Sequence, residues 1–175
     1  MKQLLILAAA LLVPALIALA ETEALDDAKI AGIVAAVNEA ELNTGDLAHL
    51  ASFYPDVRRF ALGLFEAHAE SDLRFDDWAN KKGIKPQRSS ISDRLTAGEE
   101  KFLEKLKRQD GILFDLDYMS HEVDFHQQAI DLWDETLIPN AKDEELKNLL
   151  GSMRPTLVEH LERARLIKTS LGRKK

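Results

Sequence analysis

Three histidines and one glutamate lie among apolar residues, in stretches with the periodicity of amphipathic helices: Glu41, His68, His126 and His160. Imidazole nitrogens bind Zn, Cu, Fe or Ni, and a carboxylate can complete such a site. A buried imidazole or carboxylate costs folding free energy unless it has a partner. The four residues therefore predict either a structural network of mutual hydrogen bonds or a site for a divalent transition metal (Fe, Cu, Ni or Zn).

Two further carboxylates lie one helical turn away from two of these histidines. Asp72 follows His68 by four positions, and Glu122 precedes His126 by the same spacing. Residues at this spacing lie on one face of a helix, so each pair can act together. A metal-bound imidazole needs a partner for its other ring nitrogen, and we assign this supporting role to Asp72 and Glu122.

Each of the four predicted ligands belongs to a different long helix. Apolar residues recur at helical spacing over four long stretches and one shorter one: about 24–52, 55–82, 114–137 and 142–169, with the shorter at about 92–109. The four ligands lie roughly 12 to 18 residues from the starts of their helices, and a helix rises about 1.5 Å per residue. All four are therefore expected near the middle of a bundle.

The pattern predicts an all-α fold, a ferritin-like antiparallel four-helix bundle with a short extra crossover helix. Strand signals, such as alternating β-branched runs or an Asn-Gly hairpin turn, are missing from the sequence. Long amphipathic helices joined by modest loops pack as a bundle, and the short helix stands where a ferritin-like bundle has its long crossover. The ferritin-type di-metal site needs Glu-x-x-His pairs, and the chain has none. A carboxylate-bridged di-iron site is therefore disfavoured.

The first twenty residues have the features of a secretory signal peptide. Lys2 precedes an apolar run that ends in Ala18-Leu19-Ala20, a small-x-small cleavage pattern. We expect residues 21–175 to form a single exported domain in the periplasm or the peripheral cell envelope. No transmembrane domain is expected after cleavage, and retention of the segment as a membrane anchor is the alternative.

Composition excludes several classes of function. The net charge of −7 disfavours nucleic acid as a partner, because phosphates repel an acidic protein. The chain has no cysteine, so it has neither disulfides nor thiolate chemistry. It also lacks a Gly-x-Ser-x-Gly nucleophile motif and a Gly-rich phosphate loop. We predict no catalytic residue and no cofactor beyond a transition metal, and we leave an envelope protein partner and the oligomeric state open.

Three segments resemble the DUF4142 family of exported bacterial proteins: VRRFALGLFEAH, GILFDLDYMSHEVDFHQQAIDLW and MRPTLVEHLERARLI. The resemblance covers about residues 25–168. It rests on the order of Glu41, Phe60-Ala61, His68, Phe114-Asp115, Tyr118, His126, Pro155 and His160-Leu161. The family commonly has an acidic residue just before the second-helix histidine and often before the next one, where this chain has Ala67 and Phe125. The resemblance implies a ferritin-like bundle and export, and it implies no established reaction.

These observations leave two functions. The first is a non-enzymatic periplasmic protein, stress-related or engaged in interactions, whose inward histidine and carboxylate layer is structural. The second is a periplasmic metal-binding protein that uses Glu41, His68, His126 and His160 as ligands. The sequence favours the first, and disfavours an enzyme, because catalytic motifs are missing and the ligand set of a ferritin-type oxidoreductase is incomplete.

Overall fold

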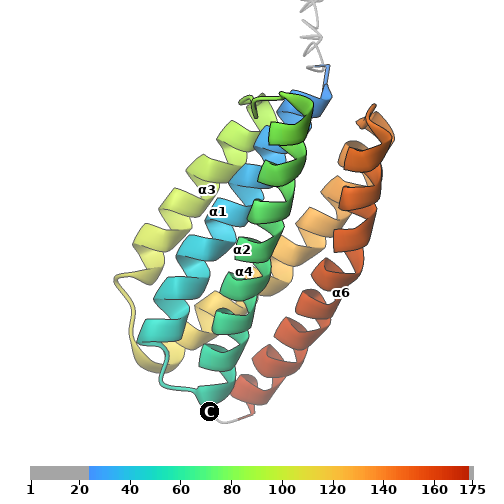
Figure 1. The fold of residues 1–175 in the computed structure, drawn as a ribbon. Helices are drawn as coiled ribbons and strands as arrows, with labels where there is room; N and C mark the ends of the chain where they lie inside the picture. Colours follow the sequence, from blue (N-terminus) through green and yellow to red (C-terminus); the bar gives the residue numbers. More distant parts are fainter. Residues whose placement is uncertain (1–23, 174–175) are drawn as a thin grey trace, which may run out of the picture.

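The computed structural model describes residues 24–173, which are almost entirely helical and contain no strand (Figure 1). The predicted all-α class is confirmed for this part of the chain. The predicted signal peptide, residues 1–20, lies outside the described residues. None of the described helices combines the length and the apolar character that crossing a membrane requires.

The first two helices, α1 (Asp27–Ala51) and α2 (Pro55–Lys82), form an antiparallel pair. α1 begins after Asp26, whose carboxylate accepts a hydrogen bond from a backbone N–H of the first turn. α2 begins at Pro55, whose fixed φ suits a first helical position. It ends at Gly83, which has a φ of 67°, a left-handed conformation that glycine adopts without strain.

The connection from α2 to α3 (Ser90–Leu106) passes very close to α1. The backbone N–H of Gln87 donates to the carbonyl oxygen of Ala28 at 2.9 Å. A Cβ atom placed on Gly32 would lie 1.9 Å from the carbonyl oxygen of Gln87. Only glycine at position 32 therefore permits this crossing.

The second half of the chain contains α4 (Gly111–Leu132) and α6 (Glu144–Gly172). The sequence predicted one α-helix over 114–137, but the last five residues form a π-helical turn, η1 (Trp133–Leu137), followed by the short α5 (Ile138–Asn140). Pro139 accounts for the change, because proline lacks an N–H and its ring crowds the carbonyl group four residues earlier.

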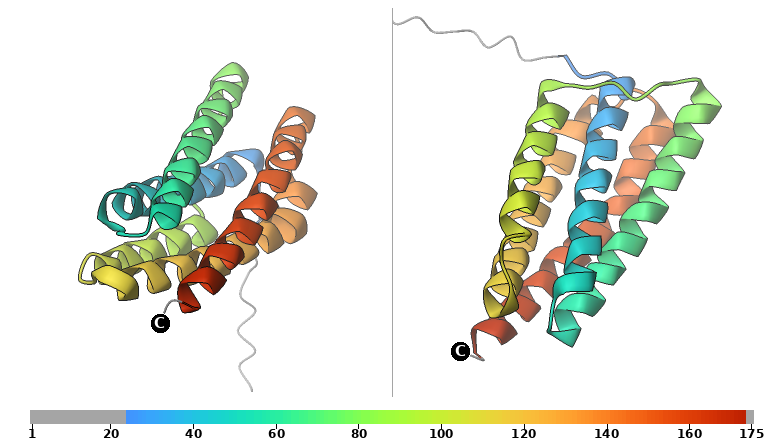
Figure 2. Two further views of the ribbon diagram at one scale, coloured as in Figure 1. Left: turned by 90° about the horizontal axis from the view of Figure 1, so that it is seen from below. Right: turned by 90° about the vertical axis from the view of Figure 1, so that its left-hand side faces the viewer.

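The helices pack in two pairs with α3 beside them. α1 packs mainly on α2, α4 packs mainly on α6, and α3 lies along α1 (Figure 2). The colours of Figure 1 show that α2 and α4 run in the same direction, with α3 returning in the opposite direction between them in the chain. Each long helix can therefore direct one face toward a shared interior.

The apolar core of this interior has two parts. One cluster includes Ile33, Trp78, Trp133 and Leu150, near the end of the bundle where α1 begins. The other includes Phe60, Phe114, Met119 and Ile167, toward the opposite end. On α1, α2 and α4, polar residues with buried side chains lie at or near the boundary between the two clusters, and on α6 the half-buried His160 lies there. The predicted ligands belong to this boundary.

Candidate metal centre

The polar layer consists of five side chains from the four long helices: Glu41 of α1, His68 of α2, Glu122 and His126 of α4, and His160 of α6. All are buried except the imidazole of His160, which is half-buried. Each occupies the inward face of its helix because it continues the apolar stripe at helical spacing. Helix periodicity therefore carries these polar groups into the core together with their apolar neighbours.

The three histidines meet in the middle of the layer. His68, His126 and His160 each present a possible ligand atom, and these atoms all lie within 4.8 Å of one another. The ring centroids are separated by 6.2 Å for His68 and His126, 5.7 Å for His68 and His160, and 5.2 Å for His126 and His160. When three imidazoles bind one tetrahedral ion at about 2.1 Å, their ring centres stand roughly 5 Å apart. The observed spacing is close to that arrangement.

Each of these imidazoles has a buried nitrogen without a hydrogen-bond partner among the described residues. The atoms are Nε2 of His68, Nε2 of His126 and Nδ1 of His160. Buried polar atoms in proteins almost always have a partner, so three such atoms in one place need an explanation. A metal ion that accepts three nitrogen lone pairs is a chemically suitable partner.

The other ring nitrogen of His68 is held by a residue that the sequence analysis did not identify. Nδ1 of His68 lies 3.0 Å from Oδ1 of Asn38, and the hydroxyl of Ser71 donates to the same oxygen at 3.0 Å. Because the Asn38 oxygen is an acceptor, Nδ1 carries the proton and Nε2 keeps its lone pair. Asp72, the predicted partner of His68, instead accepts a 3.5 Å contact from the amide group of Asn38. It supports the imidazole only through Asn38.

His126 is held from its own helix. Its Nδ1 lies 3.0 Å from the backbone carbonyl oxygen of Glu122 and 3.4 Å from Oε2 of the same residue. Glu122, the predicted partner of His126, therefore contacts Nδ1 of this imidazole through both its backbone carbonyl oxygen and its carboxylate. Since Nδ1 donates to the carbonyl oxygen, Nε2 is again the nitrogen with a free lone pair.

Glu41 belongs to a different group from the other two histidines, although it also lies beside His126. Its Oε1 is 4.0 Å from Nδ1 of His126. Glu41, Glu122 and His126 offer a second set of possible ligand atoms within 4.8 Å of one another. The layer therefore contains two adjoining groups that share His126, where the sequence suggested one site with three histidines and one carboxylate.

Burial shifts the pKa values of the layer and so decides which of its groups are charged. Burial is the main cause that holds the pKa of His68 well below its ordinary value. Burial, together with the charge of His126, also lowers the pKa of His160 to about 4. Burial and the charge of Glu122 raise the pKa of Glu41 well above its ordinary value, and burial raises the pKa of Glu122 to about 7. At neutral pH, His68 and His160 are therefore neutral imidazoles, the form that binds metals.

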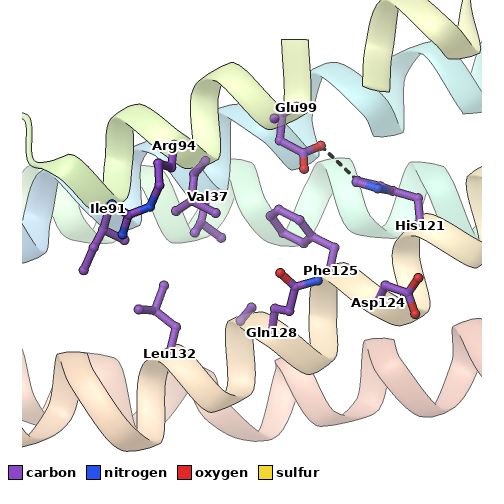
Figure 3. Close-up of a pocket in the computed structure, with 12 residues that line it drawn as sticks. Val37, Ile91, Arg94, Glu99, His121, Asp124, Phe125, Gln128 and Leu132 are labelled. Atoms are coloured by element: carbon purple, nitrogen blue, oxygen red, sulfur yellow. Dashed lines mark hydrogen bonds and ion pairs between the residues drawn. The ribbon is translucent and has the colours of Figure 1, made fainter. Parts of the chain in front are cut away.

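A groove of about 380 Å³ opens between α3 and α4, over α1 (Figure 3). Apolar residues that include Val37, Phe125 and Leu132 line it, and the Glu99–His121 pair, 2.9 Å apart, stands at one end. This pair lies near enough to the polar layer for its charges to act on both Glu41 and Glu122. The groove therefore adjoins the carboxylate side of the layer.

Fold and site together define an all-helical protein with a buried layer of histidines and carboxylates between its long helices. The sequence model of the DUF4142 family, described as a domain of unknown function, matches residues 14–167. The chain belongs to this family. Searches of curated proteins and of solved structures found no match.

Proposed function

We propose that this protein binds a divalent transition metal through His68, His126 and His160. The observation that carries the proposal is that three imidazoles from three different helices offer ligand atoms within 4.8 Å of one another, and that each ring has a buried nitrogen without a hydrogen-bond partner among the described residues. A purely structural layer is expected to satisfy its own hydrogen bonds, because a buried nitrogen without a partner costs about 1–3 kcal/mol. A bound ion removes this cost at all three atoms.

The contacts around the histidines support this assignment. A metal-bound imidazole usually donates its other N–H to an oxygen, which fixes the ring orientation and the tautomer. His68 has such an oxygen on Asn38, and His126 has one on the carbonyl group of Glu122. In both residues the other ring nitrogen, Nε2, is buried and has no hydrogen-bond partner among the described residues.

The chemistry of the ligands limits which metal ions can bind. Three imidazoles without a thiolate favour Zn, Cu, Ni or Fe over Mg or Ca. His160 is half-buried, so the centre is nearest to solvent on the side of α6. Three protein ligands leave a fourth position for water or a small molecule, which is the pattern of exchangeable rather than closed metal sites.

We further propose that the protein is exported to the periplasm and that its bundle is ferritin-like. The N-terminal sequence pattern supports export, and the parallel directions of α2 and α4, joined through α3, support a crossover topology. The acidic composition supports a function without nucleic acid. Fractionation of cells that express the full chain, with detection in the periplasmic or the cytoplasmic fraction, tests the location.

Metal content tests the function. The purified protein is dialysed separately against Zn²⁺, Cu²⁺, Ni²⁺ and Fe²⁺, and the retained metal is measured by mass spectrometry. The double variant His68→Ala/His126→Ala should lose the tightly bound ion that the parent retains. His49→Ala, which changes a histidine near the end of α1 outside the polar layer, is the matched control and should keep the ion. Circular dichroism checks that each variant is folded.

The structural alternative gives a different result. If the parent retains no metal above the level of the double variant, the layer is a hydrogen-bonded network and the proposal is wrong. In that case the double substitution should still lower the free energy of unfolding, because it removes buried imidazoles that contact one another and their partners.

A further inference from the structure

In the described part of the chain, four oxygen atoms near Nδ1 of His126 have no well-aligned hydrogen-bond partner, although Tyr118 and Glu41 both lie close enough to the Glu122 carboxyl group to influence its pKa by hydrogen bonding. The four atoms are Oε2 of Glu41, both carboxylate oxygens of Glu122 and the hydroxyl of Tyr118. All three residues are at most 1% exposed. Tyr118 and Glu122 are one helical turn apart on α4, and the charges of Glu122 and Glu41 act on the tyrosine hydroxyl. The three side chains therefore form one buried cluster of oxygen atoms.

The protein around this oxygen cluster supplies little compensating positive charge. Among the ion pairs of the described residues, the only partner of the two glutamates is His126, whose Nδ1 lies 3.4 Å from Oε2 of Glu122 and 4.0 Å from Oε1 of Glu41. His121 acts on both carboxylates from the groove, but it is paired with Glu99, whose charge opposes it. Lysine and arginine are missing from the buried residues described. Two buried carboxyl groups in such a place need either protons or a cation.

We propose that Glu41, Glu122 and Tyr118 form a second cation site, distinct from the three-histidine centre and adjoining it at His126. Carboxylate and hydroxyl oxygens favour Mn²⁺, Mg²⁺ or Ca²⁺, whereas three imidazoles favour Zn²⁺, Cu²⁺ or Ni²⁺. The polar layer therefore holds two ions of different chemical preference. The inference deepens the proposed function and rests on it, since His126 stands between the two sites.

The position of His126 explains how the sites would be coupled. Nδ1 of its ring lies within 4.0 Å of both carboxylates, and Nε2 is its unpartnered nitrogen. The same residue also offers a ligand atom to the group with His68 and His160. An ion among the carboxylates draws Glu122 toward itself, and Glu122 also provides the carbonyl oxygen that orients His126. Occupation of one site therefore alters the orientation of a ligand of the other.

The experiment loads the purified protein with Zn²⁺ and Mn²⁺ together and measures both metals after dialysis. The parent should retain one Zn²⁺ and one Mn²⁺ per chain. Glu41→Gln/Glu122→Gln keeps the side-chain shapes, removes both charges, and should retain Zn²⁺ while losing Mn²⁺. Tyr118→Phe should weaken Mn²⁺ binding about tenfold, as expected for a residue that supports or completes a metal site.

Two matched controls locate the second ion. Glu99→Gln changes a carboxylate of the groove that is paired with His121 and does not belong to the oxygen cluster, so this variant should retain Mn²⁺. His68→Ala/His160→Ala should lose Zn²⁺ and retain Mn²⁺. Replacing Zn²⁺ by Cu²⁺ in the parent should broaden the electron paramagnetic resonance signal of Mn²⁺, because the two ions then lie on either side of one imidazole.

The outcomes separate this inference from the proposed function. One Zn²⁺ and no Mn²⁺ in the parent would leave the three-histidine centre intact and refute the second site, with the glutamates then protonated. Mn²⁺ retained equally by Glu41→Gln/Glu122→Gln would place it elsewhere and also refute the inference. A parent that retains neither ion refutes both proposals. Thermal melting of each variant shows whether a lost ion reflects a lost fold.

Discussion

Nδ1 of His68 on α2 lies 3.0 Å from the side-chain oxygen of Asn38 on α1, and both residues are buried. This contact places the proton of the imidazole on Nδ1 and leaves Nε2 with a free lone pair. The same Asn38 oxygen accepts the hydroxyl of Ser71, and the Asn38 amide group contacts Asp72. One asparagine therefore contacts three polar residues of the neighbouring helix and links His68 to the other two, Ser71 and Asp72.

Asn38→Ala tests whether this contact positions His68. The variant should bind the metal of the three-histidine centre 10- to 100-fold more weakly, because an imidazole without its supporting acceptor can rotate. Competition with a chelator of known affinity measures the change. Asn43→Ala, on the exposed face of the same helix, is the matched control and should bind as the parent does. Equal affinities for the two variants would show that Asn38 has only a packing role.

Metal binding should also stabilise the fold. A ligand that binds only the native state at 100 times its dissociation constant raises the free energy of unfolding by about 2.7 kcal/mol. Chemical denaturation of the parent with and without Zn²⁺ should show a gain of this size. His68→Ala/His126→Ala should show no gain, and an equal gain in both proteins would indicate binding at unrelated surface groups.

Gly32→Ala tests the close crossing of the α2–α3 connection over α1. The added Cβ would lie 1.9 Å from the carbonyl oxygen of Gln87, a backbone atom that cannot move without shifting the loop. We expect a loss of about 1–3 kcal/mol, as for other overpacking substitutions. Gly63→Ala is the control, because a Cβ added there would meet no atom within 4 Å outside its own stretch of helix. It should instead stabilise α2 by roughly 0.5–1 kcal/mol. Urea denaturation measures both, and a loss of similar size in both would contradict the steric explanation.

Asp143 should make the stability depend on pH in the acid range. Its carboxylate accepts hydrogen bonds from Trp78 Nε1 at 3.1 Å and from the Leu146 N–H at 3.0 Å, and it pairs with Lys82 at 2.8 Å. The hydrogen bond from Lys82 is the first cause that holds the pKa of Asp143 well below its ordinary value. The stabilisation is therefore fully present above the unfolded pKa of about 3.9 and is lost as the pH falls through the lower native value.

The variant for this prediction is Asp143→Asn, which keeps a side chain that can cap α6 but removes the charge. The difference in stability between parent and variant should be largest above about pH 4 and should shrink toward pH 2. Lys82→Met should reduce the same dependence in part, because the Trp78 and Leu146 donors remain. Denaturation midpoints of the parent and Asp143→Asn are measured across this pH range. A stability difference that does not change with pH would show that the Asp143 charge is not the cause.

Ser52 and Asp115 join the α1–α2 turn to α4 across 63 residues of sequence, because the Ser52 hydroxyl donates to the Asp115 carboxylate. Both side chains are buried. Ser52→Ala should destabilise the protein by about 1–3 kcal/mol, since it leaves a buried carboxyl group without this partner. The double variant Ser52→Ala/Asp115→Ala should cost less than the sum of the single changes. Strict additivity in thermal denaturation would show that the contact contributes little.

The sequence by itself determined which residues enter the core. Helical periodicity places Glu41, His68 and His126 on the buried faces of their helices, and glycine and proline set helix ends such as the one at Gly83. These are local properties, because a helix repeats every 3.6 residues whatever lies beside it. The all-helical fold and the presence of a polar layer follow from them.

Only the tertiary structure decided how these groups meet. It gave His68 an acceptor on Asn38 in place of Asp72, and it grouped Glu41 with Glu122 on one side of His126. It also replaced the end of α4 by a π-helical turn. Periodicity specifies the face and the approximate depth of a residue on its own helix. The rotation of one helix against another and the side-chain rotamers depend on packing between segments far apart in the chain, and a contact of about 3 Å depends on both.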